Sequence, residues 1–91
     1  MNKSQLIATV AEQLEMPKVK VAAVVNTVID SVVDAVSEGE TVSLTGFGTF
    51  SSRDLAERQG RNPQTGDALV IPARKAPHFR PGRSFKTTVN G

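Results

Sequence analysis

The chain has 91 residues, which allows one domain with a core of modest size. It has no cysteine, which excludes a disulfide framework and a thiolate metal site, and it has neither a signal peptide nor a run of about 18 apolar residues, so we expect a cytoplasmic protein without a membrane partner. The net charge is only +2, but residues 1–40 carry three Lys against six acids (−3) and residues 41–91 carry eight Lys and Arg against three acids (+5), which predicts a basic surface in the second half.

A first helix is predicted from about Lys3 to Leu14. Asn2 and Gln5 form a capping box, and apolar residues follow at the spacing of one helical face. Pro17 ends this segment, because proline lacks the N–H donor and disfavours helical geometry in the residue before it. It is acceptable in the first turn of a second helix, which we expect to run to about Ser37.

The second helix has more apolar surface than one neighbouring element covers. Its valine and isoleucine residues spread over a wider arc than a single stripe, so we expect burial on two sides. A chain of this length is too short to enclose such a helix, and a partner subunit is the natural way to complete the core. The predicted dimer core consists of Val25, Val28, Ile29, Val32, Phe47 and Phe50.

The second half is predicted to form strands. Residues 41–45 alternate apolar and polar side chains, as a half-buried strand does. Gly46 and Gly48 form a tight turn that should place the ring of Phe47 in the core. Two longer strands follow over about residues 48–58 and 67–75, and Pro72 must lie at a bulge or with its nitrogen facing outward, because it cannot donate to the ladder.

A short helix from about Arg83 to Val89 closes the chain, with Phe79 and Phe85 as its anchors. The order is therefore α-α-β-β-β-α. It predicts an α+β fold with two N-terminal helices, a three-stranded antiparallel sheet from which a long β-ribbon arm protrudes, and a short C-terminal helix.

The two longer strands form a ribbon that has nothing on its own chain to pack against. Asn62-Pro63 followed by Gly66 is a strong turn signal and predicts a hairpin tip. Residues 51–61 contain only two apolar side chains, too few to bury either face of the ribbon. The tip suits a polyanion with hydrogen-bonding edges, because it has no acid between residues 58 and 66 and carries Arg58, Arg61, Asn62 and Gln64.

Other interpretations of these residues stay open at this point. The five cations between Arg74 and Lys86 are also compatible with a merely solvated face, and an exposed ribbon is compatible with edge-to-edge pairing in a protein–protein interaction arm. His78 is the only histidine and lacks the second ligand that a metal site needs. No serine has a base at a triad-like position, so we expect no metal, no cofactor and no enzymatic activity.

Four motifs along the chain resemble one family. They are Met-Asn-Lys-Ser at the start, Gly46-Phe-Gly-Thr-Phe50, Gly60-Arg-Asn-Pro-Gln-Thr-Gly66 and Pro77-x-Phe-x-Pro-Gly-Arg83. Together they look like the bacterial HU and integration host factor family of DNA-bending, histone-like proteins, and the HU type in particular. The resemblance implies an intertwined homodimer with two β-ribbon arms that embrace DNA from the minor-groove side, each with an intercalating proline at its tip, here Pro63.

The resemblance spans residues 1–91 as a single DNA-binding domain. It implies a dimerisation part over about 1–40, a sheet and arm over about 41–76 and a C-terminal helix over about 81–90. It also implies DNA condensation in the nucleoid, and a wedge between base pairs should favour distorted or nicked DNA with little sequence preference. The predicted DNA-binding residues are Lys3, Arg53, Arg58, Arg61, Asn62, Pro63, Gln64, Arg74, Lys75, Arg80, Arg83 and Lys86.

Two positions depart from the family pattern. Leu55 stands where a basic residue is common, and Asp67 stands just past the tip where lysine is common. Residues 53–75 hold five cations and three acids, a sum of +2. Within the family, the alternative to the HU type is a subunit like that of integration host factor, which pairs with a different chain and prefers particular sites.

Overall fold

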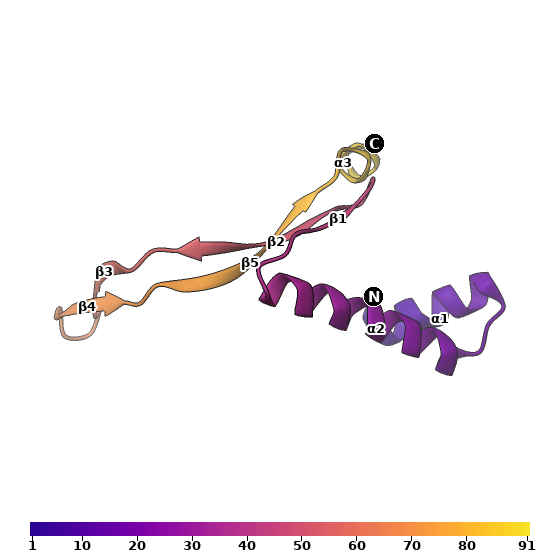
Figure 1. The fold of residues 1–91 in the computed structure, drawn as a ribbon, viewed down its shortest axis with the longest axis horizontal. Coiled ribbons are helices and arrows are strands. Elements are labelled where there is room, and N and C mark those ends of the chain that lie inside the picture. The colour runs from indigo at the N-terminus through magenta and orange to yellow at the C-terminus, as the bar shows by residue number, and fades with distance from the viewer. The chain divides into compact units, whose positions relative to one another are not determined.

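The computed structural model describes all residues from 1 to 91 and has an α+β fold, as expected (Figure 1). The chain forms two compact units, Met1–Asp34 and Ala35–Gly91. None of the helices combines the length and the apolar character needed to cross a bilayer. In chain order the elements are α1 (Lys3–Leu14), α2 (Lys18–Ser37), β1 (Val42–Leu44), β2 (Gly48–Leu55), β3 (Arg58–Arg61), β4 (Ala68–Ile71), β5 (Arg74–Pro81) and α3 (Arg83–Asn90).

Helix α1 begins at the predicted capping box. The Asn2 side chain accepts a hydrogen bond from the Gln5 backbone N–H at 2.9 Å, and the Gln5 side chain accepts one from the Asn2 backbone N–H at 2.9 Å. Two of the N–H groups that a helix start leaves without partners are thereby satisfied. The predicted bounds of α1 are confirmed.

Helix α1 ends with a left-handed residue. Glu15 has φ 53°, its N–H donates to the Glu12 carbonyl at 3.3 Å, and the N–H of Met16 donates to the Ala11 carbonyl at 3.0 Å. This pair of bonds is a Schellman motif, in which glycine is the usual left-handed residue. Pro17 follows and lies one position before α2, where its carbonyl accepts the first helical bonds.

The first unit has a small aliphatic core. Ile7 and Ala11 of α1 and Val21 of α2 are its only buried hydrophobic residues, and Val10, Ala22 and Val25 pack against them half-buried. An aliphatic core is therefore present between α1 and α2. It uses only part of the wide apolar arc of α2.

Helix α2 ends at Ser37, as expected, and Gly39 follows two residues later. Gly39 has φ +87° and donates its N–H to the Val36 carbonyl at 3.0 Å, while the N–H of Glu40 donates to the Ala35 carbonyl at 2.9 Å. This is a second Schellman motif, now with the residue that adopts positive φ without a steric cost.

The second unit contains a three-stranded antiparallel sheet in the order β1-β2-β5. Opposite residues point to the same face, and the register places Val42 opposite Phe50 and Phe50 opposite Phe79. These residues mark an apolar face. On the other face Ser43 lies opposite Thr49, with their hydroxyl oxygens 3.3 Å apart. The sheet thus has one apolar and one polar face.

All four phenylalanines gather on the apolar face and on α3. The ring centroids of Phe50 and Phe79 are 4.7 Å apart, and Phe47 stacks on Phe85 of α3 at 5.5 Å. Phe79 and Phe85 are therefore anchors of the closing helix, as expected. Phe47 joins the cluster through its 5.4 Å contact with Phe79 but stays 45% exposed, so the expectation that its ring lies in the core is only half met within one chain.

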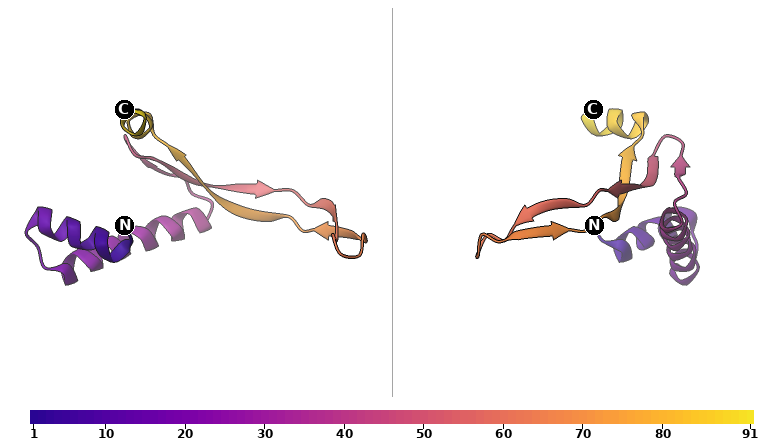
Figure 2. Two further views of the ribbon diagram at one scale, coloured as in Figure 1. Left: turned by 180° about the vertical axis from the view of Figure 1, so that it is seen from behind. Right: turned by 60° about the vertical axis from the view of Figure 1, so that its left-hand side comes forward.

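The β-ribbon is interrupted, which differs from the two continuous strands expected. Strand β2 ends at Leu55 and β3 starts at Arg58, while β4 ends at Ile71 and β5 starts at Arg74. Pro72 lies in the gap, where its missing N–H costs no ladder bond. Beyond the gap β3 and β4 form a separate two-stranded sheet, so the order contains five strands in place of three. Figure 2 shows the twisted ribbon continuing from β2 and β5 to the β3–β4 tip.

Candidate nucleic-acid interface

The tip of the ribbon is a closed loop from Asn62 to Asp67. The Asn62 N–H donates to the Asp67 carbonyl at 2.9 Å, and the Gly66 N–H donates to the Asn62 carbonyl at 2.7 Å. The Asn62 side chain also accepts from the Gln64 N–H at 2.9 Å, and Gly66 has φ +75°. The predicted hairpin tip is confirmed. These bonds hold Pro63 at an exposed position that needs no donor.

Arg61 is held against the tip loop. Its Nη1 donates to the Gly66 carbonyl at 3.3 Å. Arg61 lies opposite Ala68, whereas Arg58 lies opposite Ile71, and three positions along a strand reverse the face. The two arginines therefore point to opposite faces of the β3–β4 hairpin, so the structure does not bring all of the predicted tip cations together.

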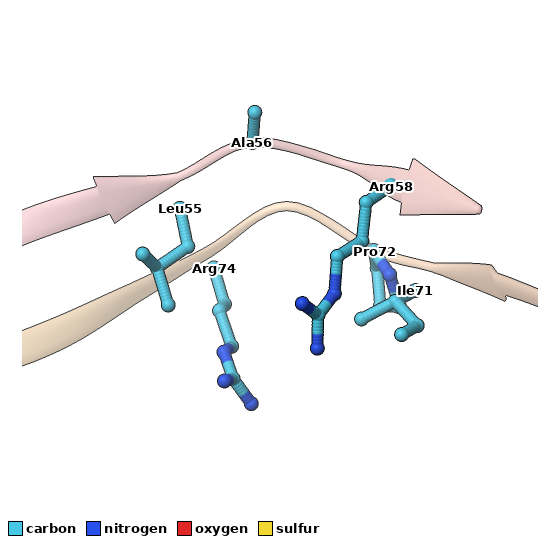
Figure 3. A pocket seen from close by; sticks show the side chains of 6 residues that line it. All are labelled: Leu55, Ala56, Arg58, Ile71, Pro72 and Arg74. Carbon is cyan, nitrogen blue, oxygen red and sulfur yellow. The ribbon is translucent and has the colours of Figure 1, made fainter. Parts of the chain in front are cut away.

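Four arginines share one face of the ribbon. On the polar face of the sheet, Arg80 lies opposite Thr49, Arg53 opposite Ala76, and Arg74 opposite Leu55. Figure 3 shows that the Arg58 side chain beyond the gap projects from the same side as those of Leu55 and Arg74. We call Arg53, Arg58, Arg74 and Arg80 the arginine row. All four are exposed.

Lys75 does not belong to the arginine row. It follows Arg74 directly and so points to the other face, where it lies opposite Asp54. The predicted contact residues at 74 and 75 are thus divided between two faces, and the carboxylate of Asp54 is the cross-strand neighbour of Lys75.

The remaining predicted cations lie on the helices. Arg83 and Lys86 are three residues apart on α3 and share one side, away from Phe85, which faces the aromatic cluster. Lys3 belongs to the first unit, where its Nζ donates to Asn26 Oδ1 of α2 at 2.8 Å. The Lys3 ammonium is thereby positioned by a second helix.

The polar face contains two residues that the sequence motifs did not single out, Ser51 and Thr49. Ser51 lies opposite His78 and Thr49 lies opposite Arg80, so Ser51, Thr49 and His78 share the face of the arginine row. The alternation of side chains along β2 and β5 indicates that these residues share a face within each strand. Only the pairing register shows that the two sets lie on the same face of the sheet. No group of three or more His, Cys, Asp or Glu side chains that could hold a metal ion is present.

A small hollow opens where the ribbon is interrupted. It has a volume of about 160 Å³ and is lined by Leu55, Ala56, Arg58, Ile71, Pro72 and Arg74. Figure 3 shows Leu55 at one end and Ile71 at the other, with the Arg74 and Arg58 side chains between them. Two cationic side chains therefore lie between two apolar ones on this face of the arm.

Known proteins are similar to this chain in sequence and in fold. The family described as "Bacterial DNA-binding protein" matches residues 1–90. The chain is 48% identical to DNA-binding protein HU-beta 2 of Neisseria meningitidis over 91 residues, which covers all of both chains. The chain belongs to the bacterial DNA-binding protein family. DNA-binding protein HU 1 of Bacillus subtilis is a further relative, 45% identical over 91 residues, which cover 100% of this chain and 99% of that one.

Solved structures of HU proteins have the same fold. An Anabaena HU–DNA cocrystal structure matches with a TM-score of 0.92 at 40% identity and covers 98% of this chain and 97% of that chain. HU from Thermotoga maritima matches with a TM-score of 0.69 at 27% identity, covering 98% of both chains. The resemblance inferred from the four motifs is confirmed, and with it the HU-type α+β fold and a DNA-binding, histone-like function.

Proposed function

We propose that this family member acts as a homodimer that binds double-stranded DNA with little sequence preference and bends it in the bacterial nucleoid. The observation that carries the proposal is the arginine row, which lines one face of a ribbon that ends in an exposed proline. A second copy of the chain supplies the second arm. The Anabaena HU, which has the same fold, was crystallised together with DNA, and this supports the assignment.

The arginine row supplies affinity without much sequence information. Guanidinium groups neutralise phosphates and release condensed counterions, and this contribution depends little on base sequence. The minor groove separates A·T from G·C pairs at best, because both orientations of each pair present nearly the same acceptors there. An arm in which arginines are four of the five cations between residues 53 and 75 therefore binds many sequences with similar affinity.

Pro63 is the residue of the tip that suits a wedge. Architectural proteins that bind the minor groove, HU among them, insert apolar side chains between base steps and kink the duplex. Pro63 is rigid, exposed and held by the hydrogen bonds of the tip loop. A nicked or gapped duplex has already lost part of the stacking that a wedge must disrupt, so it should be bound more tightly than intact DNA.

The dimer rests on the exposed apolar side of α2. Val24 is 57% exposed, Val28 53%, Ile29 44% and Val33 55%, and Phe47 of the second unit is 45% exposed. Full burial of one such side chain stabilises by about 1.5–3 kcal/mol, so covering the exposed half of each contributes roughly half of that. A second copy has the same apolar surface to bury, which favours a symmetric homodimer.

The test is a binding titration with the purified chain alone, on intact and nicked duplexes of one sequence. We expect a dimer that prefers the nicked duplex, with a log–log salt slope near −7 if on the order of eight phosphates are contacted. Pro63→Ala should reduce both the bend angle and the preference for nicked DNA and leave the slope unchanged, because no cation is removed. NMR of the tip residues provides the control that the hairpin is intact.

Three outcomes would contradict the proposal. A slope near zero would exclude the electrostatic account. An intact Pro63→Ala dimer that bends DNA like the wild type would reduce Pro63 to a turn former. A chain that dimerises only with a different subunit and selects particular sites would assign it to the integration host factor type.

A further inference from the structure

We propose that the hollow at the interruption of the ribbon holds a sugar–phosphate–sugar unit and makes the arm selective for deoxyribose over ribose. The inference rests on the proposed DNA binding and adds a specificity-determining role for Leu55 and Ile71. It starts from the order of side chains along this face, in which the Arg74 and Arg58 guanidinium groups lie between Leu55 and Ile71 (Figure 3).

Two neighbouring guanidinium groups on one side of the ribbon repel each other, and an anion bound between them would relieve this repulsion. Both arginines line the same hollow and project from the same side. A backbone phosphate satisfies both, because guanidinium donors match phosphate oxygens in geometry and charge. In a nucleic-acid strand each phosphate has a sugar on either side. A phosphate between Arg58 and Arg74 therefore places one sugar near Leu55 and the other near Ile71.

Both ends of the hollow offer hydrocarbon to those sugars. Leu55 is 36% exposed, Ile71 is half-buried, and Pro72 adds an exposed ring without an N–H donor. The Ile71 side chain lies over Gly60 of the neighbouring strand, because a Cβ at position 60 would be only 3.3 Å from Ile71 Cδ1. The missing side chain at Gly60 thus leaves room for Ile71 on this face of the hairpin.

An apolar contact discriminates between the two sugars. The 2′ carbon of deoxyribose carries only hydrogen, but ribose presents a 2′-hydroxyl on the minor-groove side. A hydroxyl pressed against Leu55 or Ile71 loses water and gains no partner, which is unfavourable. Phosphate contacts by Arg58 and Arg74 are the same for both polymers. The arginines therefore bind either strand, and the apolar ends of the hollow favour DNA.

The test compares dissociation constants for all-DNA and all-RNA duplexes of identical sequence, using the full-length dimer. Low salt makes both measurable, because binding of any polyanion strengthens as salt is removed. Since helix geometry also separates DNA from RNA, the informative quantity is the change in the RNA-to-DNA ratio of Kd on substitution. Leu55→Ser should lower this ratio by up to about a hundredfold, about tenfold for the hydroxyl that regains a polar surrounding in each of the two arms, with an unchanged salt slope.

Val70→Ser is the matched control. Val70 is 62% exposed on the same hairpin but lies opposite Gln59, on the face away from Ile71, and the substitution removes apolar surface without changing charge. It should leave the ratio within about twofold of wild type. Ile71→Thr keeps a β-branched residue in the strand and should lower the ratio as Leu55→Ser does. It provides an independent measurement in case serine at position 55 destabilises the ribbon.

An equal ratio in wild type and in both hollow variants would overturn the inference and leave DNA binding by the arm intact. Parallel loss of affinity for both duplexes in Leu55→Ser, with the hairpin intact by NMR, would likewise assign the hollow to ribbon packing. A wild-type dimer that binds neither duplex would instead contradict the proposed function.

Discussion

The helical unit and the ribbon arm both leave large side chains uncovered, but only the arm adds a row of charges to them. On α2 the uncovered side chains are aliphatic, with Val28 and Ile29 among them, whereas the arm exposes the guanidinium groups of the arginine row beside a few aliphatic side chains such as Val70. Uncovered hydrocarbon is stabilised by another protein surface, and uncovered cations are stabilised by a polyanion. The exposed apolar surface of α2 and the arginine row of the arm therefore favour two different partners, a protein surface and a polyanion.

The largest expected effect comes from placing a charge on the exposed apolar surface of α2. Val28→Asp should prevent both folding and dimerisation, because a charge without a partner in the dimer core costs on the order of several kcal/mol. Circular dichroism and light scattering would measure helix content and mass. Thr27→Asp is the control, since Thr27 is exposed one residue earlier on the polar side of α2, and it should remain a folded dimer. A folded Val28→Asp dimer would remove α2 from the interface.

Next in size is a change at the first residue of β2, in the three-stranded sheet from which the arm extends. A Cβ at position 48 would lie 2.7 Å from the Arg80 carbonyl oxygen and closer still to the Phe79 ring. Gly48→Ala should therefore lower the free energy of unfolding by about 1–3 kcal/mol, as overpacking does. Thermal unfolding measures the loss. Gly39→Ala tests a different cause, because nothing lies within 4 Å of a Cβ there and only its φ of +87° is unfavourable. An unchanged melting temperature for Gly48→Ala would mean that the strands separate freely at this point.

A third prediction tests whether DNA binds to only one face of the arm, because Arg74 and Lys75 lie on opposite faces. Arg74→Ala should flatten the log–log salt slope of DNA binding by about 1.8, which is about 0.9 for each of two arms. Lys75→Ala removes the same charge one residue later, but from the face that carries Asp54, and should flatten the slope less. Titrations of both variants from low to moderate salt give the two slopes. Equal slopes would show that DNA contacts both faces of the ribbon at this level.

The smallest expected effect lies in the helical unit and should not reach the arm. Glu15 adopts φ 53°, which is unfavourable for a residue with a Cβ. Glu15→Gly should raise the free energy of unfolding by up to about 1 kcal/mol, with part of the gain offset by the flexibility of glycine in the unfolded chain. Glu12→Gly in the interior of α1 should lower it by about 1 kcal/mol. DNA affinity should be unchanged in both, and a destabilised Glu15→Gly would contradict the strain argument.

Local signals predicted the features that are decided by neighbouring residues. The Asn2–Gln5 capping box, the break at Pro17 and the stop at Gly39 set the helix ends, and Asn62-Pro63 with Gly66 set the hairpin tip. Each depends on hydrogen bonds or backbone preferences within about five residues, so the sequence alone is sufficient. The motifs that identified the family are of the same local kind.

What only the tertiary structure decided is which residues lie opposite one another. The separation of Arg74 from Lys75, the shared face of Arg58 and Arg74, and the hollow between Leu55 and Ile71 all follow from strand register and from the interruption at Pro72. A slip of one residue exchanges the two faces of a strand without changing its composition. The amino-acid sequence therefore determined that this chain carries a cationic arm, and the pairing of distant strands decided which side of that arm is cationic.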